Sequence, residues 1–337
     1  MDNQALLDIR GLRVEYHTDE DVVYAVNGLD LTIGRGESLG LVGETGAGKT
    51  TTALSVLRLI AEPPGKIMEG EIYFNGEDLL QVKPGRLREI RGSKISVIFQ
   101  DPMTSLNPVY TVGDQIAEVI QQHQKCSKAE CREKAGDMLE MVGIPRARYD
   151  EYPHQFSGGM KQRVVIAMSI ACTPELILAD EPTTALDVTI QAQVLELMSE
   201  LKRKLQTSLL LITHDLGVVA QVCDRVAIMY GGEIVESGTI AEVFDHPHHP
   251  YTIGLFGSIP TLDETVEKLK PIEGQMPDPT IQPEGCAFAP RCPYASEACK
   301  QRKPQMVNAG GTHQVRCLVH EGVFQSPELM EEVRHGR

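Results

Sequence analysis

A glycine-rich segment that follows a short apolar run constrains the fold of this chain more than any other feature. Residues 38–42 (SLGLV) predict a buried strand, and the segment after them fits the pattern G-x-x-x-x-G-K-[ST]. That segment consists of Gly43, Glu44, Thr45, Gly46, Ala47, Gly48, Lys49 and Thr50, and residues 50–60 predict a helix after it. Glycines let backbone N–H groups converge on phosphate oxygens, Lys49 adds a cation, and the Thr50 hydroxyl can ligate Mg²⁺. The segment therefore predicts a phosphate-binding loop between a strand and a helix.

Short apolar runs alternate with helical patterns through the first part of the chain. Further strands are predicted at 95–99, 176–179 and 209–213, and an amphipathic helix at 188–204. Strands that alternate with helices indicate an α/β fold with a mainly parallel central sheet. Residues from about 103 to 170 contain no convincing strand, so we expect a helical insert there.

The pattern changes near residue 245. Beyond it, Pro and Cys become more frequent and long periodic segments stop. We therefore predict a main domain over 1–244 and a small, irregular, Cys-rich extension over 245–337. The three histidines at this point, His246, His248 and His249, are interrupted by proline and are interpreted as a linker rather than as metal ligands. The last ten residues, 328–337, are interpreted as a frayed tail.

Composition limits the partners of the chain. Its 337 residues include 32 Lys and Arg against 47 Asp and Glu, which gives a net charge of -15. Such an acidic balance argues against nucleic acid as the main partner, because phosphate binding needs a basic surface. The sequence contains no run of about 18 apolar residues, so no membrane span is predicted. The start of the chain has no secretory pattern. We expect a cytosolic location, in which structural disulfides are not expected.

Two carboxylates end the strand predicted at 176–179. Asp180 can hold Mg²⁺, which is the role of the acidic residue at a strand end in phosphate-loop NTPases. Glu181 follows it, and the turn at Pro182 can aim Glu181 at the γ-phosphate. A carboxylate in that place can orient or deprotonate the attacking water.

Two polar residues that follow other predicted strands are weaker candidates. His214 comes directly after the strand at 209–213 and can donate to the γ-phosphate. Gln100 comes after the strand at 95–99, where an amide can reach Mg²⁺ or water. Taken alone, His214 is better explained as a loop residue without a role, and Gln100 is similarly weak.

A second anion site is predicted at the start of an apolar helix. Ser157 is a good N-cap, and Gly158 and Gly159 leave the first N–H groups of the helix bare. Two phosphate-type sites in one chain suggest that both act on the same nucleotide from opposite subunits. The alternative is an ordinary helix with a good cap.

The order of these motifs resembles that of the ATP-binding subunits of ATP-binding cassette (ABC) transporters, over residues 1 to about 240. The motif Ala185-Leu186-Asp187 belongs to the same pattern, whereas Met160 stands where a glutamine is commonest. The resemblance implies an ABC-ATPase fold with a helical signature subdomain. It implies ATP contacts at Tyr16, the phosphate loop with Thr51, Gln100, Ser157, Gly158, Gly159 and Asp187. It also implies catalytic roles for Lys49, the general base Glu181 and the switch residue His214, and Mg²⁺ ligands at Thr50, Gln100 and Asp180. Tyr24 competes with Tyr16 as the aromatic residue that stacks on adenine.

A narrower resemblance, to the dipeptide/oligopeptide importer branch of this family, rests on residues 100–108 (QDPMTSLNP), residues 249–252 (HPYT) and the Cys-rich extension. It implies an ATP-hydrolysing motor on the cytoplasmic face of the membrane, peripheral to it. The implied partners are a second ABC ATPase in a homo- or heterodimer, two membrane permease subunits and, indirectly, a substrate-binding protein. The alternatives are a soluble ABC ATPase that is not coupled to transport and an importer of another small solute such as a metal chelate.

Four of the eight cysteines crowd into the extension: Cys286, Cys292, Cys299 and Cys317. Their spacing matches neither the common zinc ribbons nor the ferredoxin run, so spacing leaves the metal open. Four thiolates suit both zinc and an iron–sulfur cluster. The resemblance implies a [4Fe–4S] cluster, with Zn²⁺ as the alternative and free thiols or a disulfide as the third possibility.

The other cysteines suggest no chemistry. Cys172 and Cys223 adjoin apolar runs, so we expect them in the core. Cys126 and Cys131 are five residues apart in a polar stretch that predicts a helix, where they would not share a face.

Overall fold

The computed structural model describes residues 5–184, 186–258 and 272–335, and the chain divides into two compact units that each draw on separate stretches of sequence. The first unit contains Met1–Asp8, Thr32–Leu39 and Tyr73–Val222. The second contains Ile9–Leu31, Gly40–Ile72 and Cys223–Arg337. Ala185 of the family motif and residues 259–271 of the extension lie outside the described residues. In the part of the chain that is described, no helix is both long and apolar enough to cross a membrane.

Three parallel strands form the centre of the first unit. β6 (Ile95–Ile98), β7 (Leu176–Asp180) and β8 (Ser208–Thr213) are hydrogen-bonded in that order, with Leu176 opposite Ser208. Every residue of β7 and β8 is buried, as expected for short apolar strands that are covered on both faces. The predicted α/β fold with parallel strands is confirmed, and these strands coincide with the apolar runs of the sequence.

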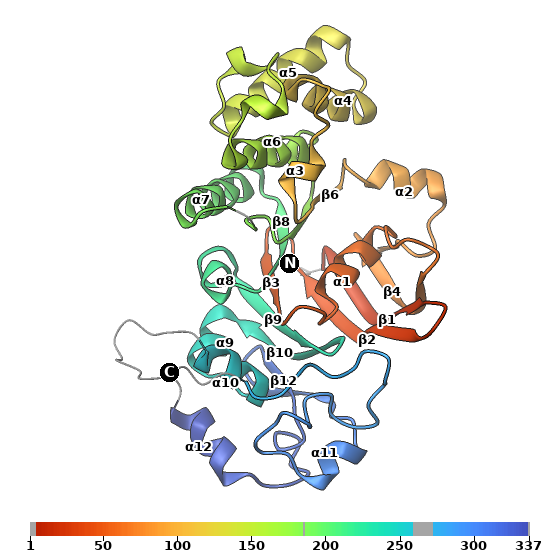
Figure 1. Ribbon diagram of the computed structural model, residues 1–337, viewed down its shortest axis with the longest axis vertical. Coiled ribbons are helices and arrows are strands. Elements are labelled where there is room, and N and C mark those ends of the chain that lie inside the picture. Colours follow the sequence, from red (N-terminus) through yellow and green to blue (C-terminus); the bar gives the residue numbers. More distant parts are fainter. Residues whose placement is uncertain (1–4, 185, 259–271, 336–337) are drawn as a thin grey trace. The chain divides into compact units, whose positions relative to one another are not determined.

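Helices occupy the first unit between β6 and β7. Thr111 caps the helix α4, and Ser127 caps α5 through reciprocal hydrogen bonds with Glu130. The helices α4, α5 and α6 contact one another, and Figure 1 shows them as a group. The helical insert that the sequence predicts is therefore present. The helices of this unit are α2 (Pro84–Ile90), α3 (Pro102–Ser105), α4 (Val112–His123), α5 (Lys128–Met141), α6 (Gly158–Ile170), α7 (Val188–Leu205) and α8 (Leu216–Val222), with 3-10 turns at Arg146–Arg148 and Pro153–Gln155.

Cys126 and Cys131 form a disulfide, with their Cα atoms 6.0 Å apart. The prediction that the two lie apart on one helix is wrong, because the cap Ser127 places Cys126 outside α5 while Cys131 lies in its first turns. The expectation of a chain without disulfides is wrong for the same reason. Cys172 is half-buried and Cys223 is buried.

Three long strands of the second unit come from the start of the chain. β2 (Val22–Ile33), β1 (Leu7–His17) and β4 (Gly65–Phe74) lie side by side in that order, and most of their residues belong to this unit. A two-residue strand, β5 (Glu77–Asp78), pairs with the end of β4. The sequence analysis did not predict these strands.

Other strands of this unit pair in antiparallel fashion. Their order is β9 (Arg225–Tyr230), β10 (Glu233–Thr239), β12 (His313–Arg316) and β11 (Met306–Gly310). Glu236 of β10 lies opposite Val315 of β12. Strands from both sides of the boundary that we predict near residue 245 therefore share one sheet, and that boundary stays a prediction. The helices of this unit are α1 (Lys49–Val56), α9 (Ile240–Asp245), α10 (Pro250–Gly257), α11 (Glu297–Gln301) and α12 (Pro327–His335).

The end of the chain is ordered by packing. α12 covers most of the stretch that the sequence suggests is a frayed tail, and only residues 336 and 337 lie outside the described part. Leu329 is fully buried and Val333 is 8% exposed, and both pack against Val319. The tail prediction is wrong because these two side chains, four residues apart, present an apolar face.

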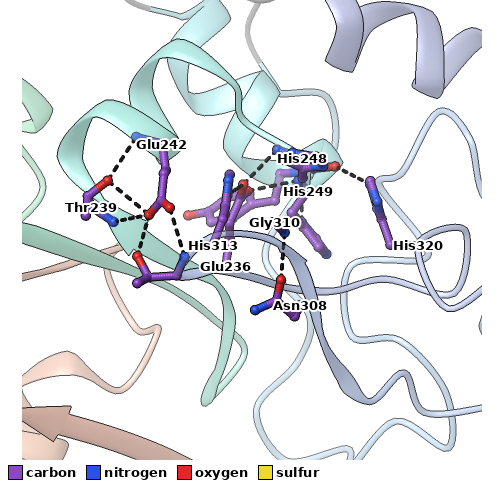
Figure 2. Close-up of polar contacts among 11 residues, drawn as sticks. Glu236, Thr239, Glu242, His248, His249, Asn308, Gly310, His313 and His320 are labelled. Carbon is purple, nitrogen blue, oxygen red and sulfur yellow. Dashed lines mark hydrogen bonds and ion pairs between the residues drawn. The ribbon is translucent and has the colours of Figure 1, made fainter.

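His248 and His249 belong to a packed cluster around Glu236, which Figure 2 shows. The Glu236 carboxylate is fully buried and accepts hydrogen bonds from the backbone N–H groups of His248 (2.7 Å) and His249 (2.9 Å). The Nε2 of His313 lies 2.6 Å from Glu236 Oε1. The His248 ring packs edge-on against His313, with ring centroids 4.6 Å apart, and His320 lies on its other side. Burial lowers the pKa of His248 to about 4 and that of His249 to about 3.

The linker interpretation is therefore wrong for His248 and His249. A buried carboxylate is costly unless several donors satisfy it, and the turn before α10 supplies two of the three donors. His249 also caps α10, because its Nδ1 accepts from the N–H of Tyr251.

Replacing Glu236 with Gln should destabilise the chain markedly. The variant keeps the shape of the side chain but puts an amide donor among three donors, so at least one of them loses its partner. We expect the free energy of unfolding to fall by roughly 2–4 kcal/mol, as for a broken buried ion pair or hydrogen bond.

Urea unfolding followed by circular dichroism measures this loss. Glu77→Gln is the control, since Glu77 pairs with Arg86 at an exposed surface, where salt bridges contribute little. Equal unfolding midpoints for Glu236→Gln and the parent chain would contradict the stabilising role.

Candidate functional site

The phosphate loop joins the fully buried β3 (Ser38–Val42) to α1. Gly46 and Gly48 have φ angles of 85° and 101°, a region that side chains disfavour. A Cβ on Gly43 would lie 2.2 Å from the carbonyl oxygen of Met229, and one on Gly48 would lie 2.3 Å from that of Ala25. Only glycine fits these places, because neighbouring backbone fills the space that a side chain would need.

Lys49 is held inside this loop. Its Nζ donates to the carbonyl oxygens of Gly43 (2.6 Å) and Glu44 (3.0 Å), and the residue is 7% exposed. Gly48 caps α1 without a side-chain hydrogen bond, so no side chain blocks the positive end of the helix. The helix ends at Val56, earlier than the predicted residue 60, because Arg58 takes a left-handed conformation soon after it.

Tyr16 lies against the helix that follows the phosphate loop. Its hydroxyl is 3.2 Å from the Thr51 hydroxyl, and its ring is partly exposed. Tyr24, the competing aromatic residue, has its backbone N–H bonded to Pro279. Tyr16 thus contacts the helix that follows the loop, and the choice of Tyr16 over Tyr24 as the residue beside a nucleotide stays a prediction.

In the first unit, Gln100 and His214, which the sequence predicted separately, both contact the carboxylate of a third predicted residue, Glu181. The Oε2 of Glu181 accepts from Gln100 Nε2 (2.8 Å) and from the Thr184 hydroxyl (2.9 Å). The Oε1 of Glu181 lies 3.0 Å from His214 Nδ1. Sequence analysis missed Thr184, although its place three residues after Glu181 in a turn was a usable signal.

The backbone sets the direction of the Glu181 side chain. Glu181 has a φ of 44°, and its N–H donates to the carbonyl of Ile212 on β8 (2.8 Å). A non-glycine residue in this region is strained, and such strain concentrates at functional sites. Asp180 precedes it on β7, opposite Ile212, and is 7% exposed. The turn that we expected after the strand thus re-aims Glu181.

Opposing effects act on the pKa of Glu181. Burial alone would raise this pKa, but hydrogen bonds from His214, Thr184 and Gln100, together with attraction to His214, outweigh burial and lower it. The carboxylate is consequently charged at neutral pH. A charged carboxylate can accept a hydrogen bond from water and orient it.

The second predicted anion site lies at the start of α6. The Ser157 hydroxyl accepts from the N–H of Met160 (3.4 Å), and both Ser157 and Gly158 are exposed. A Cβ on Gly159 would lie 2.3 Å from Ile190 of α7, so this glycine serves close helix packing. Asp187 caps α7 through the N–H of Ile190 (3.0 Å) and is also exposed. Ser157 and Asp187 have no hydrogen bond to Glu181 among those found in the described residues.

The four clustered cysteines line one cavity of about 20 Å³ in the extension, together with apolar side chains such as Phe288 and Leu318. Burial raises the pKa of Cys286 and that of Cys292 to about 12, and it also raises that of Cys317. Within residues 5–184, 186–258 and 272–335, no group of three or more His, Cys, Asp or Glu side chains is arranged to hold a metal ion. The structure therefore brings the four thiols to one place without giving direct support for the predicted iron–sulfur cluster.

Two family models match the chain. The model described as ABC transporter matches residues 26–184, and the model described as oligopeptide/dipeptide transporter, C-terminal region, matches residues 235–299. The chain is 48% identical over 318 residues to the oligopeptide transport ATP-binding protein AppD of Bacillus subtilis, covering 94% of this chain and 97% of that protein. It is 48% identical over 320 residues to the dipeptide transport ATP-binding protein DppD of the same organism, covering 94% and 96% of the two chains.

Solved structures of similar fold include the ATP-binding cassette MJ0796 in a dimeric post-hydrolysis state bound to ADP and Pi. That similarity has a TM-score of 0.62 at 28% identity and covers 69% of this chain and 98% of that one. Another is cbiO1 from Clostridium perfringens, part of the transporter complex cbiONQ, with a TM-score of 0.61 at 28% identity, covering 71% and 90%.

Replacing Glu181 with Gln should nearly abolish ATP turnover while ATP still binds. The amide cannot accept a proton from water, and loss of a general base typically costs about 10²- to 10⁴-fold in rate. Phosphate release measures turnover, and gel filtration with ATP detects the dimer that we expect to be trapped.

Glu200→Gln, an exposed substitution on α7, is the matched control. Turnover of Glu181→Gln at the rate of this control would show that Glu181 is not the base.

Proposed function

The chain belongs to the family of ATP-binding subunits of oligopeptide and dipeptide ABC transporters, and from this premise we propose that it drives peptide import through membrane permeases. As a member of this family it is an ATPase. The observation that carries the proposal is the extent of the similarity, which covers 94% of the chain and includes the C-terminal region. Soluble ABC ATPases would share the cassette but have no reason to share the extension.

In this proposal, two ATP-binding cassettes function as a dimer. They associate head to tail, and each ATP lies between the phosphate loop of one subunit and the Ser157–Gly159 segment of the other. The exposure of Ser157, Gly158 and Asp187 supports this arrangement, because all three must face a partner subunit. Whether the partner is a second copy or a related ATPase is the question that co-purification answers.

Positioning and charge carry most of the catalysis in phosphoryl transfer. Lys49 compensates the charge of the phosphates, and the charged Glu181 orients the attacking water. In the structure His214 contacts Glu181. In the proposed mechanism His214 turns to the γ-phosphate when ATP binds. Asp180 and the exposed Thr50 hydroxyl have the oxygen ligands that Mg²⁺ prefers, with Gln100 as a third candidate. Mg²⁺ adds positive charge where the transition state gains negative charge.

The surface beside Gln100 supports contact with a permease. Phe99 is 48% exposed, Val109 is 72% exposed and Tyr110 is 54% exposed. All three side chains belong to the segment between β6 and α4, and exposed apolar patches mark interaction sites. The segment also carries Gln100, which contacts Glu181, so a permease seated here would communicate with the catalytic carboxylate.

Uptake by membrane vesicles tests the transport proposal. The chain is co-expressed with a permease pair and a second ATPase of this transporter family, and ATP-dependent uptake of a labelled dipeptide and a labelled pentapeptide is measured. We expect peptide uptake that is lost in Lys49→Ala, because the phosphate loop then lacks its cation. Uptake of a labelled metal chelate without peptide would favour the alternative solute, and ATP hydrolysis without any uptake would favour an uncoupled ATPase.

We also propose that Cys286, Cys292, Cys299 and Cys317 hold a [4Fe–4S] cluster, with zinc as the alternative. The convergence of all four thiols on one apolar cavity supports the proposal. Burial raises the pKa of Cys286, Cys292 and Cys317, so loading of these thiols must release protons. The cluster would chiefly stabilise a small domain with little core.

Anaerobically purified protein should contain iron and acid-labile sulfide in equal amounts, four of each per chain. Cys317→Ala should lose most of both, since the cluster then lacks a ligand, while Cys172→Ala, at a free cysteine outside the cavity, should retain them. Iron and sulfide assays with visible absorbance provide the measurement. Stoichiometric zinc without sulfide would reject the cluster.

A further inference from the structure

Glu44, the second residue of the phosphate loop, forms hydrogen bonds and an ion pair with residues of the extension. Arg291 donates through Nη1 to Glu44 Oε2 (2.9 Å) and through Nη2 to Glu44 Oε1 (3.3 Å), a two-pronged ion pair. The N–H of Glu44 donates to the hydroxyl of Tyr251 (3.0 Å). The loop thus contacts the extension through both its backbone and a side chain.

Arg291 is itself fixed from several sides. Its side chain is only 6% exposed, and it donates to the carbonyl oxygens of Glu273 (3.0 Å) and Ile272 (3.3 Å) and to the Tyr230 hydroxyl (3.4 Å). An arginine with so many bonds in one orientation is suited to hold a partner in place. The guanidinium therefore acts as a rigid clamp and not as a mobile surface charge.

Tyr251 is equally constrained. Its ring is fully buried and packs against Tyr230, with centroids 4.6 Å apart, and against Phe288, at 5.5 Å. Tyr230 and Phe288 also contact each other, at 5.1 Å. The packing of these three rings fixes the position of Tyr251. Phe288 also lines the cavity that the four clustered cysteines share.

The charge of Glu44 explains why such a clamp is needed. The loop must receive a highly charged triphosphate, and an uncompensated carboxylate beside it would repel the ligand. Arg291 neutralises this carboxylate and keeps it turned toward the extension. In the same loop, Lys49 is bonded to the carbonyl of Glu44, so displacement of Glu44 would also disturb Lys49.

We propose that Arg291 and Tyr251 are positioning residues for ATP binding, through which the extension shapes the phosphate loop. They act through Glu44 and do not touch the nucleotide. The extension is then a working part of the nucleotide site, independently of the solute that is transported.

ATP affinity of the full chain tests this proposal. Titration calorimetry with ATP in magnesium-free buffer gives the Kd without hydrolysis, and steady-state assays give KM and kcat. We expect Arg291→Ala to raise the Kd and KM about tenfold and Tyr251→Phe to raise them severalfold, as for a lost charged or neutral hydrogen bond. The kcat at saturating ATP should change far less, because Glu181 and His214 are untouched.

A double variant separates the clamp from mere packing. In Glu44→Gln/Arg291→Ala the repelling charge is gone, so most of the lost ATP affinity should return, whereas a packing defect would persist. Arg302→Ala, which breaks another Arg–Glu pair of the extension, is the matched control and should leave the Kd unchanged.

Three outcomes would overturn the proposal. One is a parental Kd in both Arg291→Ala and Tyr251→Phe. Another is a double variant that binds ATP as weakly as Arg291→Ala, and the third is an equal loss in Arg302→Ala. Should Arg291→Ala fail to fold, Tyr251→Phe, which loses one oxygen and keeps the aromatic packing, decides the question alone.

Discussion

The need to present bare backbone to a polyanion is the constraint on which the second unit depends. Side chains are excluded from the phosphate loop at Gly43 and Gly48, and the carbonyls of Met229 and Ala25 occupy the space instead. The N–H of Gly232 bonds to the carbonyl of Ala47, so the turn between β9 and β10 is also tied to the loop. Strands far apart in sequence are therefore positioned by one short segment.

The first unit depends on a different constraint, which is the orientation and charge of the Glu181 carboxylate. Glu181 combines a strained backbone with donors from Gln100, Thr184 and His214. The hydrogen bonds offset both the strain and the cost of burial, and they keep the carboxylate charged. Preorganisation of this kind is what a water-orienting group requires, because little rearrangement then remains for the reaction itself.

The extension is more than an appendage to the cassette. β12 continues the antiparallel sheet of β9 and β10, Glu236 binds the turn before α10, and Arg291 holds the phosphate loop. Each of these contacts joins residues at least 12 positions apart. In the two polar contacts, Glu236 is fully buried and the Arg291 side chain is 6% exposed. The region that is richest in cysteine is thus also connected to the nucleotide site by polar contacts that are costly to break.

The sequence by itself determined the chemistry of the site and the parallel core. Lys49, Asp180, Glu181 and the Ser157 cap are recognisable because their spacing to a strand or helix is local. The strands β1, β2 and β4 were not predicted, because their apolar residues alternate too irregularly to separate them from loops. In β1, two exposed residues, Arg10 and Gly11, separate the buried Ile9 from the buried Leu12.

Only the tertiary structure decided the Cys126–Cys131 disulfide, the burial of His248 and His249 and the pairing of Glu44 with Arg291. The pairing of Glu44 with Arg291 spans 247 residues. No local pattern encodes such a partner, because the two residues become neighbours only when the chain is folded.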